Sequence, residues 1–447
     1  MKFQSLPGFR DSYPADMAIR QHIITGWNAV AHRYGFEQYD GPPLESLELY
    51  VAKSGEEIVG QLYNFTDKGS REVAMRPEMT PTLARMVVAK GSSLRRPVKW
   101  FAIPQLFRYE RQQKGRLREH WQFNMDILGE ADVAADAELL AAAIDSLRIF
   151  GLESADFIAR VSDRRLLSAI LLHLGASESQ VPAVFAVVDK WERQPLAVSI
   201  DKLVTAGISQ TGIDGLQAAM RIRQDHPTIH AQMQAFEALC AAEKWLDPAV
   251  TEAVDRMKRY VEILDAYGLA AYLQLDLTIV RGLAYYTGIV FELFDAKGEL
   301  RAICGGGRYD KLIETLGGDP MPALGFGMGD VVLAELLKQR GLLPDTKPTL
   351  DAYIVQVSAD VETVVLALAR KLRDDGLSVE RAFTLAGVGK QLKAASALGA
   401  AKVYIVGPDE IFGSQQVVER DMATGTEQRI SLASLLGDAL AGKLATR

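Results

Sequence analysis

Two kinds of hydrophobic pattern alternate along the chain, one with the period of a helix and one with the period of a strand. Apolar residues at helical spacing predict helices over 15–34 and 137–150, and nearly all of 166–267 has a helical pattern. Strand-like runs fill 98–128 and return at 272–304. The first two-thirds of the chain is therefore predicted to form a sheet with helices, interrupted by an inserted helical module.

The strand-like run near residue 100 divides into two strands. They are predicted over 98–111 and 121–128, joined by the polar loop 112–119. Polar and apolar residues alternate in the second strand, so Gln122 and Asp126 share one face with the asparagine between them. This predicts an antiparallel pair with an apolar and a polar side. The pattern leaves open whether the polar side is solvated or belongs to a site.

A linker is predicted over 338–349, which carries two prolines and separates two differently patterned regions. Beyond it, strands and helices alternate as β-α-β-α-β and end in a hairpin, which indicates parallel strands in a small α/β domain over 350–447. We therefore predict an α+β chain, with an antiparallel sheet and helices over 1–337 followed by the α/β domain.

Composition and charge narrow the choice of function. The chain has 447 residues, a net charge of −7 and two cysteines, Cys240 and Cys304, without a CxxC pair. We therefore expect neither a disulfide scaffold nor a metal held by a protein-only cluster. There is no P-loop, HExxH, EF-hand or GxSxG motif, and GFGMG at 325–329 lacks the third glycine of a dinucleotide site. Without an apolar leader or a run of 18 apolar residues, we expect a cytoplasmic protein that does not contact membranes.

The strongest local anomaly is a basic run over 95–118. It holds eight arginines and lysines against one acid, Glu110, which gives a local charge of +7 in a chain of net −7. Arginine suits phosphate because its planar guanidinium donates two parallel hydrogen bonds. The run predicts a site for polyphosphate or nucleic acid, with a solvated basic hairpin as the alternative.

Three further segments carry residues that suit a binding site. In MRPEMTP, Glu78 and Thr80 are two apart, so on an extended segment they would face the same way and suit an ammonium group. In VRGLAYYTG, Tyr285 and Tyr286 are expected on opposite faces of a strand, one in the core and one able to donate a hydrogen bond into a site. In ICGGGRYD, three glycines at a strand end would permit close approach to a ligand or form a structural bulge.

Taken together, MRPEMTP, LFRYERQQKGRLREHWQF, VRGLAYYTG and GGGRYD resemble the histidyl-tRNA synthetase family of class II aminoacyl-tRNA synthetases. RGLAYYTG is the most specific of them, and the resemblance covers essentially the whole chain. It implies a class II catalytic domain over 1–337, with a helical insertion at 170–262, and an α/β anticodon-binding domain over 350–447. The implied activity is histidine–tRNA ligase: ATP and L-histidine form histidyl-adenylate, and the histidyl group passes to the 3′ end of tRNA-His.

The resemblance also implies roles for individual residues. Arg108 and Arg281 would be catalytic, Arg108 by bridging the α-phosphate and the histidine carboxylate, and Arg281 by stabilising charge on the α-phosphate. The implied histidine site comprises Glu78, Met79, Thr80, Arg108, Gln122, Asp126, Arg281, Tyr285 and Tyr286. The implied ATP site comprises Arg108, Glu110, Arg116, His120 and Arg308. Mg²⁺ would neutralise the remaining phosphate charge.

Two partners follow from the same resemblance. Lys390 and Lys393 lie on a predicted helix, 388–398, within a stretch that carries four positive charges and no acid, and would contact tRNA. A homodimer would form at the sheet edge near 41–45, which holds the prolines that resemble class II motif 1.

The chain departs from the family pattern at four positions. Asp126 replaces a glutamate, His120 replaces the adenine-stacking aromatic residue, and Ala284 replaces an aspartate. Val332 takes the place of the motif 3 arginine that grips the ATP γ-phosphate, and Arg308 or Arg116 would have to compensate.

Two alternative functions stay open on this evidence. The regulatory subunit of ATP phosphoribosyltransferase is a synthetase-like histidine sensor, and loss of the motif 3 arginine would suit it. That family generally lacks the anticodon-binding domain, whereas this chain resembles synthetases there as well. The other alternative is a paralogue that binds RNA without catalysis.

Overall fold

The chain folds into two compact units, Met1–Pro344 and Asp345–Arg447. The computed structural model describes residues 3–109, 117–280, 285–347 and 349–445. The boundary between the units falls inside the predicted linker, 338–349. However, helix α12 (Asp330–Arg340) occupies the first residues of that linker and ends where Gly341 adopts a left-handed conformation with φ of 69°.

A sheet of nine strands forms the centre of the first unit. Eight strands follow the order β1-β5-β7-β12-β11-β10-β8-β9, and β6 pairs with β7. Their bounds are Glu37–Gln38, Val98–Ala102, Glu119–Leu128, Ala323–Gly329, Cys304–Arg308, Ile289–Asp295, Phe157–Asp163 and Leu273–Leu275, with β6 at Gln105–Phe107. Among the described strands, only the two outer pairs, β1–β5 and β8–β9, are parallel, so the sheet is mixed with an antiparallel centre.

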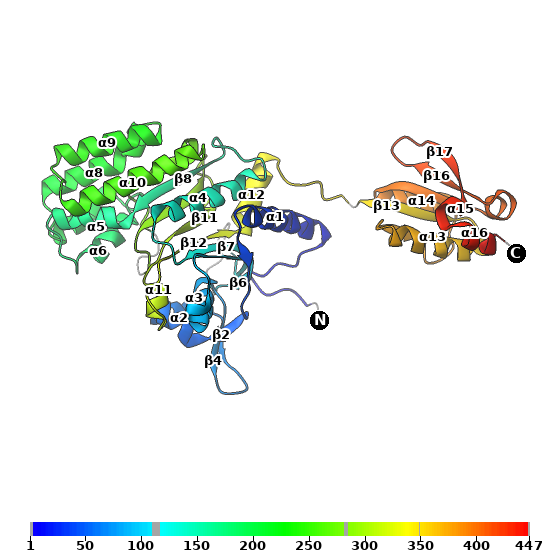
Figure 1. Cartoon of the computed structure of the whole chain (residues 1–447), viewed down its shortest axis with the longest axis horizontal. Coiled ribbons are helices and arrows are strands. Elements are labelled where there is room, and N and C mark those ends of the chain that lie inside the picture. Colours follow the sequence, from blue (N-terminus) through cyan, green and yellow to red (C-terminus); the bar gives the residue numbers. More distant parts are fainter. Residues whose placement is uncertain (1–2, 110–116, 281–284, 348, 446–447) are drawn as a thin grey trace. The chain divides into compact units, whose positions relative to one another are not determined.

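Helices α1 (Pro14–Arg33) and α4 (Val133–Arg148) cover the sheet, as Figure 1 shows. The ring of Trp27 in α1 stacks on Phe123 of β7, with centroids 5.4 Å apart. Helix α4 is alanine-rich and buried along most of its length, which lets it lie close to the strands. Its start is capped by Asp132, whose side chain accepts a hydrogen bond from the amide of Ala134 at 2.8 Å.

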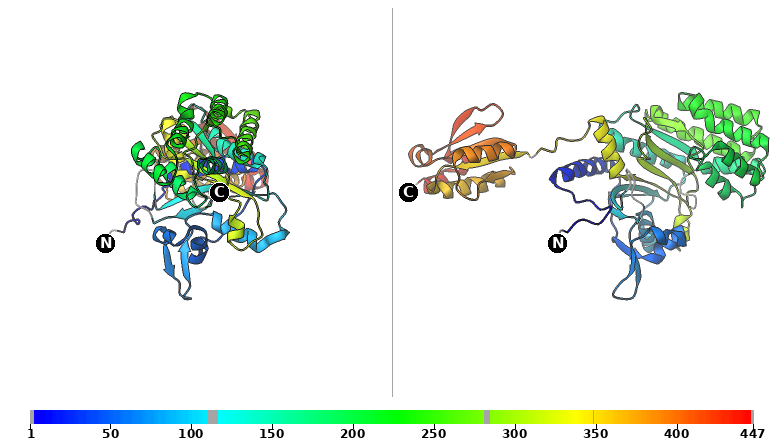
Figure 2. Two further views of the ribbon diagram at one scale, coloured as in Figure 1. Left: turned by 90° about the vertical axis from the view of Figure 1, so that its left-hand side faces the viewer. Right: turned by 180° about the vertical axis from the view of Figure 1, so that it is seen from behind.

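Six helices form the module predicted over 166–267, and they group at one end of the first unit (Figures 1 and 2). They are α5 (Arg164–His173), α6 (Val181–Val188), α7 (Leu196–Thr205), α8 (Gln210–Asp225), α9 (Ile229–Ala242) and α10 (Pro248–Ala266). One continuous apolar cluster joins their buried faces to those of α1, α4 and the central sheet. The module is therefore an integral part of the first unit.

A small three-stranded sheet, in the order β2-β4-β3, packs beside the central one. Its strands are Leu44–Ser46, Glu72–Met75 and Asn64–Thr66, and the helices nearby are α2 (Leu47–Ser54), α3 (Thr80–Lys90) and α11 (Leu312–Thr315). Strand β2 lies at an edge of this sheet.

The second unit is an α/β domain with the strand order β14-β13-β15-β16-β17. The first three strands are parallel and the last two are antiparallel, as the sequence pattern predicts. The elements are β13 (Leu350–Gln356), α13 (Glu362–Asp374), β14 (Val379–Arg381), α14 (Val388–Ala397), β15 (Ala400–Val406), β16 (Gln416–Asp421), β17 (Glu427–Ser431), α15 (Leu432–Leu436) and α16 (Asp438–Leu444).

The position predicted for the three glycines of ICGGGRYD is wrong. They lie inside strand β11 and not at its end. A Cβ at Gly306 would lie 2.6 Å from the carbonyl oxygen of Gly325, and one at Gly307 would lie 2.7 Å from that of Ile289. The strand therefore accepts only glycine at these two positions, because its neighbours approach too closely for a side chain.

The same packing predicts the effect of Gly325→Ala. Its Cβ would lie 2.8 Å from Cγ of Asp126, so the buried carboxylate would have to move. We expect a loss of about 2 kcal/mol in the free energy of unfolding, as for an overpacked core. Urea unfolding followed by tryptophan fluorescence measures it, because all five tryptophans lie in the first unit.

Gly329→Ala is the matched control on the same strand. Its Cβ would meet nothing closer than His120, at 4.0 Å, and its φ of −87° suits alanine. We expect a change within about 0.5 kcal/mol. Equal stability of the two variants would contradict the close packing at Gly325.

Candidate active site

The polar side of β7 is buried. Asn124 and Asp126 are only 5% and 4% exposed, which excludes the solvated alternative for this part of the strand. The hydroxyl of Tyr309, which follows β11, donates a hydrogen bond to Oδ1 of Asp126. Burial raises the pKa of Asp126 to about 7, although this hydrogen bond and the charge of Lys53 act in the opposite direction.

Glycines lie opposite these polar residues on the neighbouring strand. Gly325, Gly327 and Gly329 of β12 pair with Asp126, Asn124 and Gln122 of β7. Two further glycines, at 305 and 307, continue this face on β11. Because none of these positions carries a side chain, the sheet has a hollow floor where a ligand can approach the backbone.

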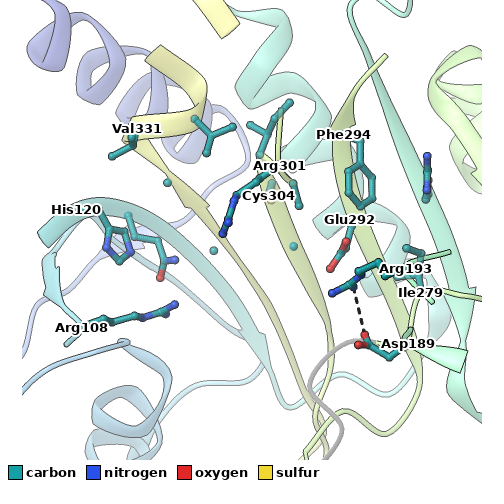
Figure 3. Close-up of a pocket in the computed structure, with 18 of the residues that line it drawn as sticks. Arg108, His120, Asp189, Arg193, Ile279, Glu292, Phe294, Arg301, Cys304 and Val331 are labelled. Atoms are coloured by element: carbon teal, nitrogen blue, oxygen red, sulfur yellow. Dashed lines mark ion pairs between the residues drawn. The ribbon is translucent and has the colours of Figure 1, made fainter. Parts of the chain in front are cut away.

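A cavity of about 770 Å³ opens over this floor. Figure 3 shows Arg108 and His120 on one side of it and Asp189, Arg193 and Glu292 on the other. Asp189 and Arg193 come from the connection between α6 and α7, so the helical module supplies part of the wall. The volume lies in the range of ordinary small-molecule sites.

Arg108 and His120, which lie together on one side of the cavity, differ in charge. Burial and the charge of Arg108 lower the pKa of His120 to about 3, so its ring is neutral at physiological pH. Nε of Arg108 donates a hydrogen bond to the carbonyl oxygen of Pro77 at 2.9 Å. This bond links the segment LFRYE to MRPEMTP, as the predicted site requires.

Lys53, at the end of α2, is a residue that no sequence motif indicated. Its side chain is 5% exposed, and its ammonium forms an ion pair with Oε2 of Glu78. The same ammonium lies 4.1 Å from the ring centroid of Tyr285. A lone lysine in a helix gives no signal in a sequence, and only the packing of α2 on α3 and the tyrosines brings it into the site.

Two geometric expectations are wrong. Tyr285 and Tyr286 precede β10 and stack on each other, with centroids 4.3 Å apart, so they do not lie on opposite faces of a strand. Thr80 is the first residue of α3, and Met79 before it has helical dihedral angles, so Glu78 and Thr80 do not share an extended segment. The side chain of Met79 is completely buried.

The position of Arg308 contradicts the ATP role predicted for it. Its guanidinium is 4% exposed and donates to Asp136 at 2.5 Å and 3.1 Å, to Asp310 at 3.3 Å and to the carbonyl oxygen of Glu130 at 2.9 Å. These partners hold Arg308 below the floor of the sheet, where it stabilises the start of α4. Four other expectations fall on Glu110, Arg116, Arg281 and Ala284, which lie outside the described residues.

The basic side chains of the run 95–118 lie in several different environments. Lys99 forms an ion pair with Glu138 and donates to the carbonyl oxygen of Tyr34, whereas the guanidinium of Arg118 lies 4.4 Å from the ring centroid of Tyr109. In the described part of the run, Arg108 is the basic residue that lines the cavity.

The comparisons with known proteins agree with this architecture. The profile of the histidyl-tRNA synthetase family matches residues 8–330, and that of the anticodon binding domain matches residues 351–439. The chain belongs to the histidyl-tRNA synthetase family. A histidine–tRNA ligase from Opitutus terrae is 44% identical over 436 residues, which cover 95% of each chain. The chloroplastic/mitochondrial histidine–tRNA ligase of Arabidopsis thaliana is 38% identical over 96% of this chain and 85% of its own length.

Solved structures support the fold at lower identity. A histidyl-tRNA synthetase from Nostoc has a TM-score of 0.82 at 23% identity and covers 99% of both chains. A protein from Bacillus halodurans described as an ATP phosphoribosyltransferase regulatory subunit/histidyl-tRNA synthetase has a TM-score of 0.74 at 23% identity, over 88% of this chain and 96% of its own. The fold is that of a class II synthetase catalytic domain followed by a small α/β anticodon-binding domain.

The described ranges contain no candidate membrane span and no candidate metal cluster. None of the helices there is both long and apolar enough to cross a membrane. In the same ranges, no group of three or more His, Cys, Asp or Glu side chains is placed to hold a metal ion.

An N-terminal ion pair adjoins the cavity in this synthetase fold. Arg10 donates to Glu119 at 2.6 Å and to Asp330 at 3.1 Å, and both carboxylates are almost completely buried. Asp330 also accepts a hydrogen bond from the amide of Trp121 at 3.0 Å. Arg10 therefore joins the N-terminal segment to the starts of β7 and α12, which carry His120 and Val332.

Arg10→Met should destabilise the first unit, because it leaves two buried carboxylates without their shared cation. We expect a loss of about 3 kcal/mol in the free energy of unfolding, measured by urea titration and tryptophan fluorescence. Arg71→Met removes an exposed ion pair with Asp67 and should leave the unfolding midpoint nearly unchanged. An equally small effect of both changes would show that Arg10 does not hold this junction together.

Proposed function

We propose that this histidine–tRNA ligase activates histidine on the polar side of β7 and binds ATP in the adjoining cavity. The observation that carries the proposal is the union of buried Asp126, the glycine floor and Arg108 on one face of the sheet. These groups would supply a carboxylate for recognition, a surface that a ligand can approach closely and a cation for phosphate.

The histidine site would centre on Asp126. When ionised, its carboxylate can accept a hydrogen bond from an imidazole N–H, and Tyr309 holds it in place. Glu78 would bind the α-ammonium group, with Thr80 and the stacked Tyr285 and Tyr286 nearby. Because Lys53 pairs with Oε2 of Glu78, the other carboxylate oxygen can accept from the substrate.

Gln122 and Arg108 would bind the carboxylate side of the substrate. A site built from such groups rejects analogues that leave its buried polar atoms without partners, which gives specificity for histidine. Met79 stays in the proposed site only as packing beneath Glu78, because its side chain is completely buried.

In the reaction, a carboxylate oxygen of histidine attacks the α-phosphorus of ATP, and the bond from that phosphorus to the pyrophosphate oxygen breaks. Arg108 would contact the α-phosphate, and the neutral ring of His120 would stack on adenine. Arg281, Glu110 and Arg116 are assigned here by the sequence resemblance alone. Positioned cations stabilise the charge that develops in such a step.

Magnesium would accompany ATP. Mg²⁺ usually binds through one or two carboxylates and substrate phosphates, and Glu292 lines the cavity above the floor, so the residues present fit a metal brought by the nucleotide. When bound, the ion supplies positive charge to the phosphates. We further propose that motif 3 is atypical here, with Val332 where the family pattern has arginine.

The anticodon unit would bind tRNA through α14. Lys390 and Lys393 are exposed and three residues apart, so they lie on one side of this helix. Phe383 is 87% exposed, and Arg381 lies 5.7 Å from its ring centroid. Positive charge beside an exposed aromatic ring suits an unstacked base with its phosphate.

Dimerisation and location complete the proposal. The edge strand β2, which follows the two motif 1 prolines, is where a second copy would join. A cytoplasmic location stays a prediction, and one relative is chloroplastic/mitochondrial. The histidine-sensor alternative is disfavoured by the anticodon-binding unit and by curated ligases of 38–44% identity along nearly the whole chain.

Histidine-dependent ATP–pyrophosphate exchange tests the activation step. Wild-type protein should exchange with histidine and with none of the other 19 amino acids. Arg281→Ala should reduce exchange by about two orders of magnitude, as expected for loss of a cation at the α-phosphate. Absence of exchange in a protein that still binds histidine in calorimetry would favour the sensor or RNA-binding alternatives.

The pKa of Asp126 predicts how histidine use depends on pH. The ionised carboxylate is the acceptor, so kcat/KM for histidine should fall as pH decreases through about 7. Tyr309→Phe removes a hydrogen bond that stabilises the ionised form, so the inflection should move to higher pH. Because the substrate is the same, its own titration cancels between the two proteins, and an unchanged inflection would exclude Asp126 as the titrating group.

A further inference from the structure

The end of the cavity formed by α12 provides no cation of its own. Val331 and Val332 line the cavity there, and Figure 3 shows Val331 on the same side as His120. The triphosphate of ATP carries several negative charges, so a polyphosphate bound over this floor needs positive charge from another element.

Arg301 enters the cavity at this place. It belongs to the connection between β10 and β11, and Figure 3 shows its side chain extending over the glycine floor toward the side of His120 and Arg108. The floor beneath it includes Gly305, Gly327 and Gly329, which hold no side chain that would keep a phosphate away.

The backbone on either side of Arg301 is anchored. Asp295 accepts hydrogen bonds from the amides of Lys297 and Glu299, at 3.3 Å and 3.1 Å, and from Arg340 at 2.7 Å. On the other side, the amide of Ile303 donates to the carbonyl oxygen of Leu293 at 2.8 Å. The guanidinium therefore extends from a braced connection, which limits the entropy lost when it binds a ligand.

Three arginines near the cavity or beneath its floor pair with carboxylates of the protein. Arg160 pairs with Asp276 and Glu192, and Arg193 lies 3.8 Å from Asp189. Arg308, the candidate from the sequence, is buried against Asp136. Each of these three arginines therefore has a carboxylate of the protein as its partner.

We propose that Arg301 binds the β- and γ-phosphates of ATP and stabilises pyrophosphate as it leaves, in place of an arginine at position 332. The inference rests on the proposed activation of histidine at this site. As the histidine carboxylate bonds to the α-phosphorus, the electron pair of the breaking P–O bond passes to pyrophosphate. The planar guanidinium of Arg301 would stabilise that charge by donating two parallel hydrogen bonds to oxygens of the pyrophosphate.

ATP–pyrophosphate exchange of the full chain with Arg301→Met tests the proposal. We expect kcat/KM for ATP to fall by about 100-fold and KM for pyrophosphate to rise, because both ligands lose the same contact. Arg301→Lys should retain part of the activity, since it keeps the positive charge but loses the pair of parallel N–H donors of the guanidinium. Histidine binding measured by calorimetry should be unchanged, which also shows that the variant is folded.

Lys297→Met is the matched control, because this lysine is an exposed cation in the same connection and does not line the cavity. It should leave the kinetics within twofold of wild type. In the background of Arg301→Met, the change Val332→Arg should restore at least a tenth of the lost kcat/KM for ATP. Such recovery would show that the two positions serve the same phosphates.

Two results would overturn the proposal. One is an Arg301→Met protein whose kcat/KM for ATP stays within threefold of wild type. The other is a loss confined to KM for histidine, which would place Arg301 at the amino acid. Failure of the wild type to exchange at all would instead count against the proposed function, so the two failures are distinguishable.

Discussion

The close approach of strands β7, β12 and β11 is the constraint on which the site depends. Asp126 projects over Gly325 with no room for a Cβ between them, and Gly307 is held as tightly by the backbone of β10. Without side chains on this part of the floor, the sheet can bring its backbone up to a ligand and still keep a carboxylate buried beside it. Both the buried carboxylate and the cavity result from the same packing.

Burial of charge is the second determinant of the site. Arg10 with Glu119 and Asp330, and Arg308 with Asp136, each place a cation against buried carboxylates. In the pair of Lys53 with Glu78, the lysine is the buried partner. An unpaired charge would be costly in these places, so the pairs fix the geometry of the segments that carry them. Asp126 differs, because its partner is a tyrosine and burial raises its pKa to about 7.

Hydrophobic periodicity predicted the helices and strands well wherever the pattern depends on neighbouring residues alone. The helices near 15–34 and 166–267, the β7 strand and the alternating second unit follow hydrophobic periodicity, which depends only on neighbouring residues. The stacked pair Tyr285 and Tyr286 and the position of the glycines in β11 were predicted wrongly. Both depend on where strand pairing begins, and pairing is decided by residues distant in the sequence.

Motifs and hydrophobic periodicity can be read without a structure, and they were enough to indicate the family, the two-part organisation, the polar face of β7 and the segment around Arg108. Which charged side chains meet depends on the tertiary packing. In the folded chain, Lys53 pairs with Glu78, Arg308 forms a buried ion pair and Arg301 extends into the cavity. A charge acts on its neighbours over a few ångströms in space, and the number of residues between two side chains does not show how far apart they lie in the fold.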